Sequence, residues 1–172
     1  MGIAREAIAD CFHGIETKRV LPESPELFVK KGAFVTLTKG EDLRGCIGRI
    51  EPHAPLFQTV AEMAKAAAFQ DPRFSPIVAA ELPGVVIEIS VLSLLERVKE
   101  VDAVEVGRHG LVIRRGSASG LLLPQVAVHR RWSKEEFLGQ LCLKAVLPID
   151  AWREAGTELF AFTAEVFSEK DV

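Results

Sequence analysis

"AFVTLTKGEDLRGCIGRI", residues 33–50, contains two runs of β-forming residues joined by the turn-like KGED. This pattern predicts an antiparallel hairpin, which indicates a sheet whose neighbouring strands run in opposite directions. The second strand carries LRGCIG, residues 43–48, in which Cys46 lies between two glycines and two positions after Arg44. The segment raises the question of whether Cys46 reacts, is recognised by a partner, or only packs.

Helical and strand patterns surround this hairpin. Apolar residues at helical spacing predict helices over about residues 2–16 and over 56–69, and the first helix places Cys11 on its buried apolar stripe. Residues 70–76, QDPRFSP, contain two prolines and predict a loop. The remaining expected elements are a strand at 84–93, a second hairpin around the turn at 116–120, a helix that begins at Ser133, and a strand at 159–167. Together these elements predict an α+β fold with an antiparallel or mixed sheet flanked by helices.

The composition is that of a globular protein. At 172 residues and 48% hydrophobic, the chain can bury a core within one domain, or one domain with a small lobe. The 21 basic and 24 acidic side chains nearly cancel to a formal charge of -3, which argues against nucleic-acid binding. The apolar runs are shorter than the roughly 20 residues that span a bilayer, and the N-terminus lacks a secretory h-region. We therefore expect a soluble, cytoplasmic protein whose three cysteines are reduced.

The LRGCIG segment has a chemical interpretation. On a regular strand, Arg44 and Cys46 point to the same side. A guanidinium beside a thiol favours the thiolate, which is the nucleophilic form of cysteine. Gly45 and Gly48 are expected where another backbone or a ligand approaches the strand closely.

A structural interpretation stands beside the chemical one. A cysteine in a β-strand is often a small buried hydrophobic side chain, and the two glycines can accommodate a tight crossing of two elements. Arg44 can likewise be an ordinary surface charge, or it can hold a carboxylate such as Glu88 or Asp71. The sequence does not choose between these pairings.

A nucleophilic cysteine usually needs a base, and His53 is the best-placed histidine in the sequence. It follows the LRGCIG strand at the start of a loop and helix that can fold back beside Cys46. The chain has no phosphate-loop lysine motif, no dinucleotide fingerprint and no paired histidines on a helix face. We therefore expect neither a cofactor nor a metal.

Six blocks of the sequence resemble one protein family. FVTL followed by LRGCIG, then AAFQDPRFSP, IEISVLS, GLLLPQVAV and LCLKAVLP, occur in the order and approximate spacing of the AMMECR-type domain, also called AmmeMemoRadiSam system protein A. The resemblance covers nearly the whole chain. It implies a single two-lobed α+β domain over residues 1–172, with residues 43–48 near the cleft between the lobes.

The resemblance and the residue chemistry together give a set of candidate site residues. We expect Cys46, Arg44 and His53 to be catalytic. We expect the residues that bind a substrate or partner to be Gly45, Gly48, Asp71, Arg73, Glu88, Gln125 and His129. The chain departs from the family at His129, where similar proteins have a glutamate, and at KAVL, where they have KAGL. His129 becomes the preferred base if it approaches Cys46.

Two functional hypotheses follow. In the first, the protein is an enzyme whose Cys46 thiolate acts as a nucleophile or redox group on an unknown small molecule. Similar proteins are grouped with a Memo-type protein and a radical SAM protein in one proposed system, which implies these two partners and a shared modification pathway. In the second, the protein is a non-catalytic interaction module whose LRGCIG strand and DPRF loop bind a partner protein.

Overall fold

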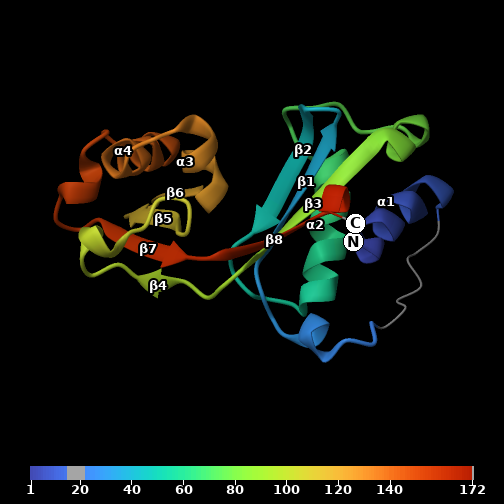
Figure 1. Ribbon diagram of the computed structural model, residues 1–172, viewed down its shortest axis with the longest axis horizontal. Coiled ribbons are helices and arrows are strands. Elements are labelled where there is room, and N and C mark those ends of the chain that lie inside the picture. The colour runs from blue at the N-terminus through green and yellow to red at the C-terminus, as the bar shows by residue number, and fades with distance from the viewer. Residues whose placement is uncertain (15–21, 172) are drawn as a thin grey trace. The chain divides into compact units, whose positions relative to one another are not determined.

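The computed structural model describes residues 1–14 and 22–171 (Figure 1). The chain divides into two compact units, the first comprising Met1–Leu92 with Glu165–Val172 and the second comprising Ser93–Ala164. Each unit contains a four-stranded sheet built from antiparallel pairs together with helices, so the α+β prediction is confirmed. Within the described residues, no helix is long and apolar enough to cross a membrane.

The sheet of the first unit has the strand order β2-β1-β3-β8. Its strands are β1 (Ala33–Lys39), β2 (Asp42–Arg49), β3 (Val85–Leu92) and β8 (Ala164–Ser168). Helix α2 (Leu56–Phe69) packs against β1 and β2, and helix α1 (Gly2–His13) packs against α2. The 3-10 helices of this unit are η1 (Pro25–Phe28), η2 (Ala79–Gly84) and η5 (Glu169–Asp171).

The core of the first unit lies between the sheet and α2. Val35 and Leu37 of β1 and Ile87 of β3 are fully buried in it. Burial of each large aliphatic side chain contributes roughly 1.5–3 kcal/mol, which holds the sheet against the helix. Because alternate residues of a strand point to opposite faces, Thr36 and its neighbour across the ladder, Cys46, lie on the other face of the sheet.

The predicted hairpin at residues 33–50 is confirmed, with a bulge that the sequence pattern does not show. Strands β1 and β2 pair antiparallel, and Thr36 lies opposite Cys46. The register shifts by one residue at Arg44, which therefore has no partner on β1. The turn contains Gly40 at a φ of 64°, a conformation that glycine adopts without a steric penalty.

The sheet of the second unit has the strand order β4-β7-β5-β6, and α4 supplies much of its core. Its elements are β4 (Glu96–Arg97), η3 (Val101–Ala103), β5 (Gly110–Arg115), β6 (Ala118–Leu122), α3 (Pro124–Arg130), α4 (Lys134–Lys144), η4 (Ala151–Arg153) and β7 (Glu158–Phe162). Ser133 caps α4 as predicted. Its Oγ accepts a hydrogen bond from the Glu136 N–H at 3.2 Å, and the Glu136 carboxylate accepts one from the Ser133 N–H at 2.7 Å.

The first helix differs from its prediction in the position of Cys11. This residue is exposed, and its thiol donates to the carbonyl oxygen of Ala7 at 3.3 Å. The prediction of a buried Cys11 is wrong because the apolar face of α1 continues through Phe12, whose ring packs edge-on against Phe69 at 5.4 Å between centroids. The helix ends at His13, where Gly14 caps it in a left-handed conformation, which is earlier than the predicted end at about residue 16; residues 15 and 16 themselves lie outside the described residues.

The predicted strand at 159–167 is two strands in two different sheets. β7 belongs to the second unit and β8 to the sheet of the first, with Thr163 between them. The alternation of apolar and polar residues continues across this change of sheet. A period of two indicates extended backbone but does not say which neighbour the strand pairs with.

Candidate functional site

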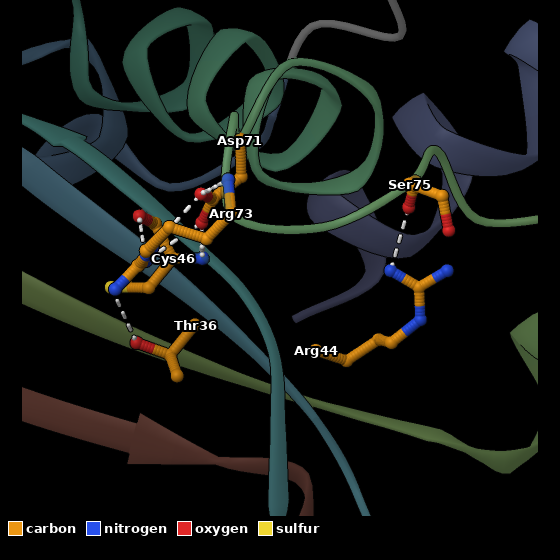
Figure 2. Close-up of polar contacts among 6 residues, drawn as sticks. All are labelled: Thr36, Arg44, Cys46, Asp71, Arg73 and Ser75. Atoms are coloured by element: carbon orange, nitrogen blue, oxygen red, sulfur yellow. Dashed lines mark hydrogen bonds and ion pairs between the residues drawn. The ribbon is translucent and has the colours of Figure 1, made fainter.

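Cys46 lies in the middle of β2 with its backbone turned toward a loop. Its N–H donates to Oδ2 of Asp71 at 2.8 Å, and its carbonyl oxygen accepts a hydrogen bond from Nη2 of Arg73 at 3.2 Å (Figure 2). Its sulfur accepts a hydrogen bond from Oγ1 of Thr36 at 3.3 Å. Cys46 is therefore held at its N–H, its carbonyl and its sulfur, and the residue is half-buried.

Asp71 and Arg73 form a clamp on the edge of β2. Nε and Nη2 of Arg73 donate to the two carboxylate oxygens of Asp71 at 2.9 and 2.7 Å, and the Arg73 N–H adds a third bond at 3.1 Å. The Asp71 side chain is 2% exposed and the Arg73 side chain 55%. The clamp takes the place that a further strand would occupy beside Cys46, and so protects this edge of the sheet from pairing with another chain.

The clamp changes the proton affinity of both of its members. The hydrogen bond from Arg73 lowers the pKa of Asp71 well below its ordinary value; burial opposes this shift, and the N–H of Cys46 adds to it. The same bond raises the pKa of the Arg73 guanidinium, and the side chain of Cys46 acts in the same direction. The guanidinium of Arg73 therefore lies near the side chain of Cys46.

The loop that carries the clamp is held in place by its own backbone. Asp71 precedes Pro72 and therefore avoids helical geometry, which ends α2 at Phe69. The N–H of Phe74 then donates to the carbonyl of Asp71 at 3.1 Å and closes a turn. The guanidinium of Arg73 lies 5.4 Å from the centre of the Phe74 ring, within the range of a cation–π contact.

Arg44 lies elsewhere than the sequence predicts. Its guanidinium donates to both carboxylate oxygens of Glu81, at 3.2 and 3.1 Å, and to the carbonyl of Ser75 at 2.8 Å. Figure 2 shows the side chain extending toward Ser75 and away from Cys46. Arg44 lowers the pKa of Glu81 to about 2. The expectation that Arg44 flanks the thiol fails because the bulge breaks the strict alternation on which it depended, and Arg73 occupies that place.

The two glycines of the LRGCIG segment are each explained by a close neighbour. A Cβ on Gly45 would come within 2.1 Å of the carbonyl oxygen of Ala67 in α2. A Cβ on Gly48 would come within 2.1 Å of the ring of Phe34, its partner on β1. The absence of a side chain at Gly45 therefore lets α2 pack closely against β2. The absence of one at Gly48 lets the ring of Phe34 lie on the face of the sheet that carries Cys46.

The other candidate residues are distributed over both units. Glu88 is half-buried on β3 and lies directly opposite Thr36. His53 is exposed and pairs with Glu51 at 3.1 Å, and among the described residues it is not a hydrogen-bond partner of Cys46. Gln125 and His129 lie on α3 in the second unit, where His129 is exposed.

Sequence reasoning did not select Thr36. The alternation within FVTLTK places this residue on a face, but the register of the hairpin is needed to set it opposite Cys46. Within residues 1–14 and 22–171, no group of three or more His, Cys, Asp or Glu side chains is arranged to hold a metal ion.

Comparisons with known proteins cover almost the entire chain. The model of the AMMECR1 family matches residues 1–167. A protein of Methanopyrus kandleri is 44% identical over 181 residues, which cover 98% of this chain and 86% of that protein. A protein of Methanocaldococcus jannaschii is 43% identical over 162 residues, which cover 88% of this chain and 81% of that protein. The crystal structure of an uncharacterised protein from Pyrococcus horikoshii superimposes with a TM-score of 0.93 at 40% identity, covering 98% of this chain and 89% of that one.

Proposed function

The chain belongs to the AMMECR1 family. From the geometry around Cys46 we propose that it is a cysteine-dependent enzyme, and from the family resemblance we propose that it acts in a modification system with a Memo-type protein and a radical SAM protein. Cys46 is the nucleophile and acts on a small molecule. The three cysteines of the chain are free thiols, which supports a reducing, cytoplasmic setting for this chemistry.

The observation that carries this proposal is the position of Arg73. Its guanidinium donates to the carbonyl oxygen of Cys46 and lies near the side chain, where a positive charge stabilises negative charge that develops at the site during the reaction. In the reaction, a lone pair of the thiolate forms a bond to an electrophilic carbon, and the leaving group departs with the bonding pair. The proton lost by the thiol passes to solvent, which the half-buried side chain reaches.

The chain contains its own controls for a test of thiol reactivity. Cys11 is exposed on α1, whereas Cys142 is buried on α4 and its pKa is raised by that burial. With limiting iodoacetamide at pH 5 to 9, mass spectrometry of the separated peptides measures the alkylation rate of each thiol. We expect Cys46 to react faster than Cys11 below pH 8, and Cys142 to react last. A Cys46 that reacts no faster than Cys11 at any pH would overturn the proposal.

The partnership with a Memo-type and a radical SAM protein rests on the family resemblance and needs its own test. The purified chain is mixed with each candidate partner from the same genome, and complex formation is measured by calorimetry. We expect binding to at least one of the two proteins, and we expect Cys46→Ser to preserve it, because serine keeps the backbone contacts of the clamp. If neither protein binds, the proposed partnership is wrong. The proposed reactivity of Cys46 is then still decided by the alkylation experiment.

A non-catalytic interaction surface is the second candidate, and the exposure of the DPRF loop favours it. Pro72 and Arg73 are exposed, as is Leu43 at the start of the LRGCIG segment. This function predicts that Arg73→Glu abolishes partner binding while Cys46 shows no enhanced reactivity. Because Arg73 is tied to Asp71, a melting curve must first confirm that Arg73→Glu folds.

A further inference from the structure

Three polar side chains lie in one row across the face of the first sheet. Cys46 of β2 is opposite Thr36 of β1, and Thr36 is in turn opposite Glu88 of β3. Residues that are directly opposite each other in antiparallel strands point to the same face. The thiol, the hydroxyl and the carboxylate are therefore presented side by side, and all three are half-buried.

The backbone hydrogen bonds set the length of this row. The N–H and carbonyl of Cys46 point outward to Asp71 and Arg73, so Cys46 and Thr36 form a non-hydrogen-bonded pair. Thr36 then faces Glu88 in a hydrogen-bonded pair, because such pairs alternate on the two sides of a strand. The Cα atoms of Cys46 and Glu88 are thus roughly 10 Å apart, the sum of about 4.5 and 5.5 Å.

The two ends of the row carry opposite charges. Arg73 lies at the Cys46 end, and Glu88 is the acidic group at the other end. Within the described ranges, the carboxylate of Glu88 has neither a hydrogen bond nor an ion pair, although it is half-buried. A partly desolvated carboxylate without a partner gains most from a cationic ligand.

We propose that Glu88 is the cation-binding subsite of the thiol site, and that the substrate carries an ammonium or guanidinium group at the opposite end from the atom that Cys46 attacks. This inference rests on the proposed nucleophilic function of Cys46. The hydroxyl of Thr36 lies between the two ends, and the ring of Phe34 over Gly48 provides an apolar wall beside the row. An extended substrate with an apolar middle and a positive end fits this arrangement of groups.

Alkyl methanethiosulfonates test the inference without knowledge of the substrate. The Cys46 thiolate attacks the sulfenyl sulfur of such a reagent, a mixed disulfide forms, and methanesulfinate leaves with the bonding electron pair. The probes are aminoethyl and aminohexyl methanethiosulfonate, each with an uncharged alkyl reagent of matched length. We expect the aminohexyl probe to label Cys46 about tenfold faster than its uncharged match, because only the longer chain lets its ammonium reach Glu88. The aminoethyl probe should show a smaller preference.

Two variants and one internal thiol complete the experiment. Glu88→Gln should abolish the preference for the aminohexyl probe, whereas Glu41→Gln, an equal change of charge in the exposed hairpin turn, should leave it intact. Labelling of the exposed Cys11 should show no dependence on chain length in any variant. A Cys46 that reacts rapidly with all probes alike, or a preference that survives Glu88→Gln, would overturn this inference and leave the proposed function standing. A Cys46 that reacts with every probe as slowly as Cys11 would instead overturn the proposed function.

Discussion

Nη2 of Arg73 donates to the carbonyl oxygen of Cys46 at 3.2 Å while the same nitrogen holds the carboxylate of Asp71 at 2.7 Å. One guanidinium thus fixes the backbone of the cysteine and a nearly buried acid at the same time. Because Asp71 also accepts the N–H of Cys46, both backbone groups of this residue depend on the clamp. Loss of either clamp residue should therefore affect both the stability of the first unit and the environment of the thiol.

Asp71→Asn should destabilise the protein by about 1–3 kcal/mol, because an amide cannot accept all the hydrogen bonds that the carboxylate accepts and leaves Arg73 without its counter-charge. Urea unfolding followed by circular dichroism measures the change in the free energy of unfolding. Asp42→Asn is the matched control, since Asp42 is exposed at the start of β2 and its replacement should change stability by less than about 0.5 kcal/mol. Equal effects of the two variants would contradict a structural role for the clamp.

The lowered pKa values of two carboxyl groups, Asp71 in the clamp and Glu81 beside Arg44, predict how stability depends on pH. The pKa of Asp71 and that of Glu81 are lower in the folded protein than in the unfolded chain. The stabilisation that these groups provide is therefore fully present above the unfolded pKa, about 4, and is lost as the pH falls through the folded values. We expect the urea concentration at the midpoint of unfolding to decrease as the pH is lowered from about 4.5 to about 2. The decrease should be less steep in Asp71→Asn. An unchanged slope in the variant would contradict this assignment.

Gly45→Ala should destabilise the first unit strongly, by about 2 kcal/mol or more, because the new methyl group meets the carbonyl oxygen of Ala67 at 2.1 Å and α2 must move. Thermal unfolding measures the loss. Gly84→Ala is the control, since a Cβ at that position has no heavy atom within 4 Å and the backbone does not require glycine. A Gly45→Ala protein as stable as Gly84→Ala would show that β2 and α2 are not in close contact.

Val146→Gly should stabilise the second unit by about 1 kcal/mol. Val146 has a φ of 59° and is 92% exposed, so a β-branched side chain adopts a left-handed conformation without burying its apolar surface. Glycine removes this strain at the cost of a more flexible unfolded chain, which offsets part of the gain. Calorimetry should show a higher melting temperature, and a lower one would contradict the assigned conformation. The glycine that KAGL of similar proteins places here is consistent with this strain.

Much of the fold follows from local patterns in the sequence. The hairpin at 33–50, helix α2 and the Ser133 cap were predicted because period, turn residues and capping residues are local signals. The bulge at Arg44 was not predicted, because it arises from pairing between strands. Because of this bulge, the side chain of Arg44 points toward Glu81 and Ser75 and does not lie beside the thiol of Cys46. Asp71 and Arg73 were recognised as candidates from their family block, but their contact with Cys46 depends on tertiary structure.

The most direct test of the account compares Arg73 with Arg44 as the arginine that acts on the thiol of Cys46. The measured quantity is the ratio of the iodoacetamide alkylation rates of Cys46 and Cys11 at pH 7, in variants whose melting curves confirm folding. Arg73→Leu should lower this ratio at least about threefold, with partial recovery in Arg73→Lys, whereas Arg44→Leu should leave it within about twofold. A ratio that falls in Arg44→Leu and is unchanged in Arg73→Leu would contradict the account.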